Sequence, residues 1–522
     1  MAQHSFAMTP SANIQRSSFD RSHGHKLTMD ADYVVPVFVD EALPGDTMNM
    51  KARIFARMAT PIYPLMDNLY LDTFWFAVPY RLVWENWHKF LGAQDDPGDS
   101  IDYTIPTMQA PGAGYAVNSL HDYMGLPPGV ADFQHSSLLL RSYNLIWNEW
   151  FRDENLQDSI TVDKDDGPDN QVNYVIKKRG KRHDYFTSCL PWPQKSDTGV
   201  SLPLGTSAPV LGIGINNPSS TASYSTKFSD DTTSSIDGWQ SVDGSPAAGE
   251  TRVIIEEGTT GFPNIYADLS SATAATINAI RLAVTTQQFL ERDARGGTRI
   301  NEIILSHFGV MSPDSRVQRP EYLGGSSKRI DINSVPQTSE SNTTPQGTLS
   351  AFGTVFEDYT GFMKSFSEHC LILGLAMVRA DITYQQGLER MWSRSTRYDF
   401  YWPTFANLGE QAVLQQEIEV TDPAAGTNDD VFGYQERWAE YRYKPSRISG
   451  LYRSAAAGTL DPWHLSEDLS SPALNATFIE SNTPMTRVKA VTSEPDFLVD
   501  CHFNYKSVRP MPVHSVPGLV RF

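Results

Sequence analysis

Hydrophobic and polar residues alternate most regularly close to the end of the chain, over residues 498–507. The apolar series is Val499, Cys501, Phe503 and Tyr505, and the polar series is Asp500, His502, Asn504 and Lys506. A period of two residues is typical of a β-strand with one buried face. Residues 350–356, 370–379, 412–420 and 434–443 also have strand character, so the last third of the chain is predicted to be rich in β-structure.

Two further strands are predicted near the beginning of the chain. The segment YVVPVFVDEA at residues 33–42 contains Pro36, which has no N–H to donate, so we expect this strand at a sheet edge or paired on one side only. The segment LYLDTFWFAVP at residues 69–79 is apolar on both faces from Phe74 onward. A strand of this kind needs cover on both sides, which a second sheet or a neighbouring subunit could supply.

Helical spacing of apolar residues occurs in four segments, at residues 81–92, 136–154, 272–294 and 299–308. Gly92 ends the first of them, and Gly296 and Gly297 separate the last two. Strands near both ends of the chain, with long insertions between them, predict a mainly β protein. The expected architecture is an antiparallel β-sandwich that is elaborated at its loops and carries a few helices.

Two polar segments interrupt this pattern. Residues 1–28 show little apolar periodicity, which predicts an extended N-terminal arm. Residues 196–250 are rich in Ser, Thr, Gly and Pro and contain one basic residue, Lys227, which predicts a loop-rich insertion with small strands. The predicted division is therefore an arm at 1–28 and a β domain at 29–522. That domain is interrupted by a surface insertion at 196–271 and a helical segment at 272–310.

The overall composition excludes some classes of protein. The 522 residues include 61 acidic and 42 basic ones, which gives a net charge of −19. This charge argues against a dedicated binder of duplex DNA, which would normally be basic overall. It does not exclude local basic patches. The three cysteines are distant from one another and lack CxxC spacing, so we expect free, buried thiols in a reducing compartment. The N-terminus has no apolar signal region, and the longest apolar stretch, at residues 370–378, is too short to span a bilayer. A soluble protein made in a cytoplasm is expected.

A search for catalytic and metal-binding motifs gives no convincing match. GxSxG, HExxH, a Walker-A loop and GxGxxG are all absent. His23 and His25 have no carboxylate or cysteine beside them, and the acidic segment at residues 153–169 lacks the EF-hand pattern, so a solvated loop is expected there. The adjacent His183 and Asp184 would point to opposite faces of a strand and would not form a catalytic dyad. The sequence therefore predicts no enzymatic activity, no metal site and no cofactor.

Basic residues gather in three clusters, two of which contain many aromatic residues. The first cluster is Lys177, Lys178, Arg179, Lys181 and Arg182; the second is Arg390, Trp392, Arg394 and Arg397; the third is Arg437, Arg442 and Lys444, with Arg447 and Arg453 following. Arginine mixed with aromatic residues suits a single-stranded nucleic acid, because guanidinium groups bind phosphates and rings stack on bases. The same composition is typical of oligomer interfaces and also occurs in ordinary packing. From the residues alone these three interpretations stay open.

Several long motifs resemble a known family of viral proteins. They are FDRSHGHKLTMDADYVVPVFVDEALPGDT at residues 19–47, TPIYPLMDNLYLDTFWFAVPYRLVWENW at 60–87, KKRGKRHDYFTSCLPWPQK at 177–195 and WAEYRYKPSR at 438–447. In these motifs the chain resembles the major capsid proteins of gokushoviruses, small single-stranded DNA bacteriophages of the Microviridae. The resemblance weakens between about residues 196 and 272 and again at 333–348.

This resemblance implies a fold and a function. The fold would be an antiparallel, eight-stranded viral jelly roll with long loop insertions. Sixty copies would form a T=1 icosahedral shell around circular single-stranded DNA, together with minor virion proteins of the same phage. The insertion at 196–271 would form a protrusion that contacts a receptor on the bacterial surface. The protein would be assembled in the cytoplasm of the bacterial host and would reside in the virion.

Two other classes of protein remain as alternatives. The first is a β-rich protein that binds or cleaves carbohydrate, suggested by 11 Trp, 22 Tyr and many carboxylates. Such a protein should be monomeric and should expose a cleft with paired Asp or Glu residues. The second is a free single-strand-binding protein, which should bind DNA as a soluble monomer with a steep dependence on salt.

Overall fold

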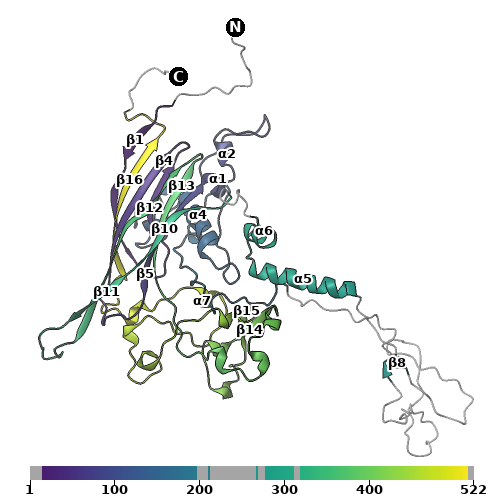
Figure 1. The fold of residues 1–522 in the computed structure, drawn as a ribbon. Coiled ribbons are helices and arrows are strands. Elements are labelled where there is room, and N and C mark those ends of the chain that lie inside the picture. The colour runs from purple at the N-terminus through teal and green to yellow at the C-terminus, as the bar shows by residue number, and fades with distance from the viewer. Residues whose placement is uncertain (1–13, 197–209, 212–265, 268–276, 311–317, 515–522) are drawn as a thin grey trace, which may run out of the picture. The chain divides into compact units, whose positions relative to one another are not determined.

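The computed structural model describes residues 14–196, 210–211, 266–267, 277–310 and 318–514 (Figure 1). The chain divides into one unit made of Met1–Pro193 with Asp293–Phe522 and a second unit, Gln194–Arg292. The predicted insertion at 196–271 falls in the second unit, and nearly all of it lies outside the described residues. The boundaries of the predicted domains therefore stay predictions.

The larger unit contains a six-stranded antiparallel sheet in the order β1-β16-β4-β12-β11, with β2 also paired to β16. Its strands are β1 (Ser17–Asp20), β2 (His23–Met29), β4 (Thr47–Met58), β11 (Asp331–Pro336), β12 (Leu349–Ser365) and β16 (Phe497–Arg509). The predicted alternation in β16 is confirmed, because Val499, Cys501, Phe503 and Tyr505 are buried and the residues between them are exposed. The range predicted as an extended arm thus includes β1 and most of β2, which pair with β16 of the same chain.

A four-stranded antiparallel sheet has the order β10-β5-β13-β3. Its strands are β3 (Val35–Ala42), β5 (Leu69–Pro79), β10 (Glu321–Arg329) and β13 (Cys370–Ala380). Strand β3, which contains Pro36, lies at the edge and pairs with β13. This confirms the prediction that the strand with Pro36 is paired on one side only.

Strands β5 and β13 are buried on both faces, as the sequence predicts for β5. On one face Trp75 of β5 packs against Phe503 of β16 and Phe362 of β12, within a core shared by the two sheets. On the other face Phe76 belongs to a second core that includes residues of helices α1 (Tyr80–Val83) and α4 (Leu138–Ile146). The cover that the sequence requires therefore comes from this chain itself: a sheet on one side and helices on the other.

The remaining elements are short, apart from one long helix. They are α2 (Trp87–Phe90), β6 (Thr107–Gln109), α3 (Leu120–Tyr123), β7 (Gln134–Ser136), β8 (Val210–Leu211), β9 (Tyr266–Ala267), α5 (Ile277–Arg295), α6 (Ile300–Phe308), β14 (Glu410–Leu414), β15 (Val431–Glu436) and α7 (Ala476–Ile479). The helix predicted at 81–92 is thus two short helices, α1 and α2, the first beginning one residue earlier. The strands predicted at 412–420 and 434–443 are shorter than expected, because each gives way to a 3-10 turn, Gln415–Glu417 and Ala439–Tyr441. Among the described helices, none combines the length and the apolar character needed to span a membrane.

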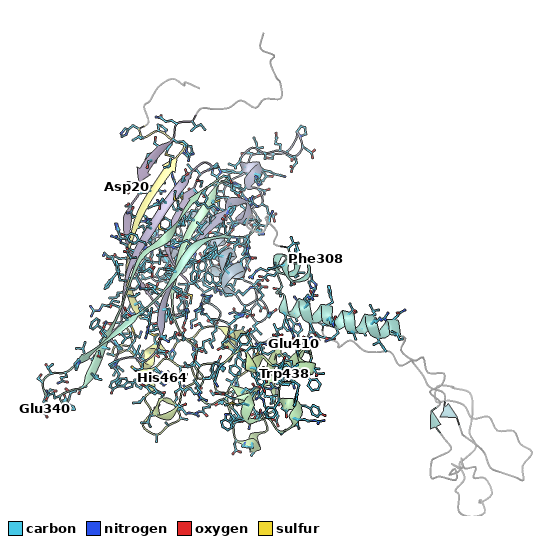
Figure 2. All side chains as sticks on the ribbon, in the orientation of Figure 1. Asp20, Phe308, Glu340, Glu410, Trp438 and His464 are labelled. Carbon is cyan, nitrogen blue, oxygen red and sulfur yellow. The ribbon has the colours of Figure 1, made fainter. Side chains whose placement is uncertain are left out.

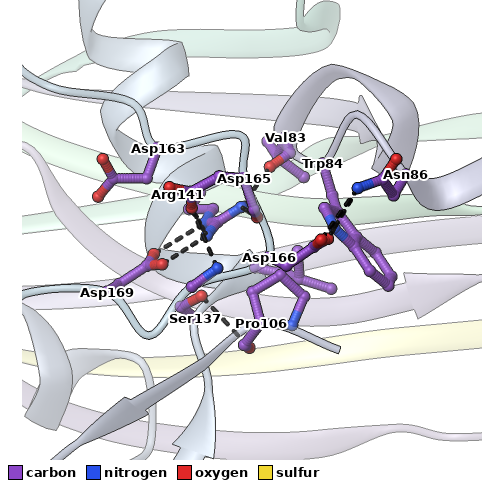
Figure 3. Close-up of polar contacts among 12 residues, drawn as sticks. Val83, Trp84, Asn86, Pro106, Ser137, Arg141, Asp163, Asp165, Asp166 and Asp169 are labelled. Atoms are coloured by element: carbon purple, nitrogen blue, oxygen red, sulfur yellow. Dashed lines mark hydrogen bonds and ion pairs between the residues drawn. The ribbon is translucent and has the colours of Figure 1, made fainter. Parts of the chain in front are cut away.

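The acidic segment at 153–169 is tied to the helical layer through Arg141 of α4 (Figure 3). The guanidinium of Arg141 is fully buried, and its Nε donates a 2.7 Å hydrogen bond to Oδ2 of Asp169, whose side chain is also fully buried. Arg141 also donates to the main-chain oxygens of Val83, at 3.0 Å, and Asp165, at 2.9 Å. Burial raises the pKa of Asp169, but hydrogen bonds from Arg141 and Tyr174 outweigh this effect, and its pKa lies below the ordinary value. The expectation of a wholly solvated loop is therefore wrong at Asp169.

We predict that Arg141→Ala destabilises the larger unit by about 3–5 kcal/mol, because it leaves the carboxylate of Asp169 buried without its charged partner. The loss should appear as an earlier urea-unfolding midpoint, followed by tryptophan fluorescence. As the control, Lys26→Ala breaks the exposed 2.9 Å ion pair with Asp500 and should cost less than about 1 kcal/mol. Equal losses in the two variants would contradict the account.

The pair should also depend on pH. Because the pKa of Asp169 is lower in the folded chain than in the unfolded chain, its contribution is complete above the ordinary carboxyl range. The contribution is lost as the pH falls through the lowered pKa. The stability difference between the native chain and Arg141→Ala should therefore narrow in acid.

Candidate nucleic-acid interface

A pocket of about 360 Å³ lies between two loop segments of the C-terminal half, residues 384–394 and 440–453. A parallel bridge between Tyr384 and Arg447 connects these segments. Figure 2 labels Trp438, which lies two residues before the second segment. The lining brings residues of the second and third basic clusters together: Arg390, Trp392, Arg394, Tyr441, Tyr443, Lys444, Arg447 and Arg453. Three other residues predicted in these clusters, Arg397, Arg437 and Arg442, do not line it.

The pocket is supported by a small apolar core and by short turns. Tyr185, Phe186 and Tyr384 line the pocket and belong to a core that also contains Val413 of β14 and Phe432 of β15. Aromatic residues of this core pack closely, with the ring centroids of Phe186 and Tyr384 4.7 Å apart. The core therefore gives the two loops a rigid base.

The conformation of Trp438 redirects the chain next to the pocket. Its φ of 69° lies in the left-handed region, which is costly for a bulky residue. The indole Nε1 donates a 2.9 Å hydrogen bond to the main-chain oxygen of Phe405, and the buried ring lies against Tyr401. These contacts favour the strained backbone at the start of the 3-10 turn that carries Tyr441.

Carboxylates of the same chain neutralise most of the cations around the pocket. Arg390 lies 3.1 Å from Glu417 and Arg394 lies 3.4 Å from Glu440, and both arginine side chains are largely buried. Lys444, at 3.2 Å, and Arg447, at 2.8 Å, share Glu389, while Arg442 pairs with Glu436. Burial raises the pKa of Glu417, and the charge of Arg390 opposes that shift. Arg390 and Arg394 therefore have a structural role, whatever else they bind.

Exposed aromatic rings are the more distinctive feature of this surface. Trp392 is 70% exposed, and the other exposed rings nearby are Tyr398, Phe400, Tyr401, Trp402, Tyr441 and Tyr443. Arg394 lies over the ring of Tyr441, at 4.4 Å, and over that of Phe400, at 5.4 Å. Arg397 is exposed and lies over the ring of Tyr398, and no carboxylate of the described residues is within 4 Å of it. Rings exposed next to guanidinium groups are the arrangement that stacks bases and contacts phosphates.

The cluster at 177–182 is divided between packing and surface. Lys181 is buried, pairs with Glu467 at 2.7 Å and donates to the main-chain oxygen of Phe478. Arg179 lies over the rings of Phe74 and Phe151, and burial lowers its pKa. Lys178 donates to Asn482.

Three members of this cluster, Lys177, Lys178 and Arg182, show no ion pair within the described part of the chain. Arg182 is exposed and Lys177 is half-buried. Arg179, Lys181 and Arg182 line a second hollow of about 360 Å³. The pocket between residues 384–394 and 440–453 is called the basic–aromatic pocket below. Lys444 lines both this pocket and the second hollow, so the first cluster is continuous with the basic–aromatic pocket.

The described residues contain no group of three or more His, Cys, Asp or Glu side chains that could bind a metal ion. His183 lies 3.5 Å from Asp153 rather than pairing with the adjacent Asp184. The three cysteines are free and buried, as predicted, and burial raises the pKa of Cys370 and Cys501 to about 12. Thiols of this kind are poor nucleophiles.

Sequence reasoning missed the acidic partners of the basic clusters. Glu389, Glu417 and Glu440 come from three separate segments, and their pairing depends on how those segments pack. The local signals that were available are the position of Glu389 directly before the second cluster and that of Glu440 within the third.

Comparison with known proteins gives full-length similarity to viral capsid proteins. A family model described as "Capsid protein (F protein)" matches residues 7–519. The chain is 49% identical to the capsid protein VP1 of Bdellovibrio phage phiMH2K and 45% identical to that of Chlamydia phage 1, and in each case the match covers 99% of this chain and 98% of the relative. Capsid protein VP1 of Spiroplasma virus 4 is 37% identical over the same shares.

Proposed function

We propose that this chain, which belongs to the phage capsid F protein family, assembles as sixty copies into one closed T=1 icosahedral shell around circular single-stranded DNA. The chain is a structural capsid protein and not an enzyme. The observation that carries the proposal is its similarity, over nearly its whole length, to capsid proteins of several phages. That similarity does not favour the carbohydrate-active alternative.

The two facing antiparallel sheets support the proposed fold, an eight-stranded jelly roll. A jelly roll limits the exposure of strand edges by folding two sheets together. Large apolar side chains that are exposed in the single chain support burial against neighbouring copies; Met363 of β12 is 74% exposed and Phe308 of α6 is 77% exposed.

The basic–aromatic pocket is the proposed contact with the enclosed DNA. The candidates remain those of the three clusters: Lys177, Lys178, Arg179, Lys181, Arg182, Arg390, Trp392, Arg394, Arg397, Arg437, Arg442 and Lys444. Because most of these cations are already paired, the exposed rings of Trp392 and Tyr443 and the exposed Arg397 should contribute most of the affinity. Contacts of this kind recognise phosphates and base faces without reading the sequence.

The insertion at 196–271 is proposed as an outward protrusion that contacts the bacterial surface. Its near lack of positive charge argues against a position facing the DNA. Loops that project from a rigid scaffold are where binding function concentrates. The further partners are minor virion proteins, and the proposed location is the virion, after assembly in the host cytoplasm.

Expression of the chain, alone and with the other structural proteins of its phage, tests the assembly. We expect closed particles of uniform size in electron micrographs, with a mass by sedimentation that corresponds to sixty copies. A stable monomer at micromolar concentration, under conditions in which intact phage persists, would contradict the proposal.

Replacement of exposed rings tests the DNA contact. Trp392→Ala should weaken binding of the full-length chain to a fluorescent oligo(dT) by about 1–3 kcal/mol, the usual contribution of one base–aromatic stack. Phe308→Ala removes a comparably exposed ring from α6 and serves as the control. If both variants bind like the native chain, Trp392 does not contact DNA.

Shortening the insertion tests its role. With residues 200–249 replaced by a tight turn, particles should still assemble but should no longer adsorb to host cells. Assembly and adsorption are measured separately, by sedimentation and by depletion of free particles. Normal adsorption of the shortened particles would contradict the proposal, and a failure to assemble would show that the segment is a spacer between subunits.

A further inference from the structure

The outward face of the six-stranded sheet carries a row of cations on its central strand, β4. The inward residues Ala52, Ile54, Ala56 and Met58 are buried, so the alternate residues Lys51, Arg53, Phe55 and Arg57 point outward. Phe55 is 45% exposed and lies between two arginines on the same face. Neighbouring strands add aromatic side chains to this face: Phe356 of β12 pairs directly across from Phe55 and is 55% exposed.

Carboxylates neutralise only part of this face. Arg53 lies 2.8 Å from Asp358 and also lies over the ring of Tyr359, with 4.7 Å between its guanidinium carbon and the ring centroid. Asp500 of β16 is paired with Lys26 of β2. Within the described residues no carboxylate lies within 4 Å of Lys51 or Arg57, the cations nearest the two ends of the row.

One end of the row opens into a hollow of about 640 Å³. Phe55, Leu498 and Val117 give it apolar surface, and all three are at least 45% exposed. Arg57, Lys26 and Asn118 lie at the same hollow. Two carboxylates also line it: Asp500, which is paired with Lys26, and Asp122, which accepts a hydrogen bond from the main-chain N–H of Asn118. An apolar hollow beside cations is suited to a ligand that has flat rings and negative charges.

We infer that this face is a second binding surface for a single-stranded polynucleotide, with bases stacked on Phe55 and Phe356 and phosphates bound by Lys51 and Arg57. Open β-sheet faces with exposed aromatic residues bind single strands in this way. A polynucleotide matches the face better than an acidic peptide does, because the paired rings of Phe55 and Phe356 lie next to the cations of β4. The inference rests on the proposed enclosure of single-stranded DNA, and it involves none of the residues of the basic–aromatic pocket.

The experiment measures binding of fluorescein-labelled dT20 to the full-length, unassembled chain over a range of salt concentrations. Phe55→Ala should weaken binding roughly tenfold through loss of one stack. The double variant Lys51→Gln with Arg57→Gln should reduce the slope of log affinity against log salt by about 1.4, since each phosphate contact with a single strand contributes about 0.7. Ultraviolet cross-linking of genome-filled particles should then attach DNA to the peptide that contains Phe55.

Matched controls separate this face from general charge and exposure. Lys164→Gln removes an exposed lysine that has no ion pair among the described residues, and Phe308→Ala removes an exposed ring. Both controls should bind dT20 like the native chain.

Two results would overturn the inference. The first is unchanged affinity and salt slope in the Phe55 and Lys51/Arg57 variants while Trp392→Ala weakens binding, which would leave the proposed function intact. The second is normal DNA binding with failed assembly, which would make this face an interface between copies. If native particles contain no DNA at all, the proposed function itself fails.

Discussion

Burial of strands β5 and β13 on both faces is the constraint on which the larger unit depends. An apolar strand of this kind is stable only between two covering layers. The six-stranded sheet supplies one layer, with Phe503 against Trp75, and the α1–α4 layer supplies the other around Phe76. The buried pair of Arg141 and Asp169 then joins the helical layer to the segment that follows it.

Charge is distributed in a way that suits a shell protein. The chain has a net charge of −19, and most arginines of the basic clusters already have a carboxylate partner. The exposed aromatic rings beside these ion pairs would then provide much of the proposed contact with a nucleic acid. Contacts made by rings depend less on salt than contacts made by lysine and arginine.

The sequence predicted those parts of the fold that depend on local patterns. The alternation in β16, the edge position of Pro36 and the two-faced burial of β5 all follow from side chains that are close in sequence. The pairing of β2 with β16 was not foreseen, because HGHKLTM has little apolar periodicity and its partner is more than 450 residues away. For the same reason the ion pairs of Arg390 and Arg394 could not be predicted, although their clusters could.

The central claim is that this sandwich forms the wall of a shell, with its basic–aromatic surfaces turned toward the genome. A reconstruction of genome-filled particles by electron cryo-microscopy, at a resolution that shows side chains, tests it most directly. The account predicts one copy of the chain per icosahedral asymmetric unit, and nucleotide density against Trp392 and Arg397 on the inner surface. Density for a neighbouring protein subunit at these residues, or their exposure on the outer surface, would contradict it.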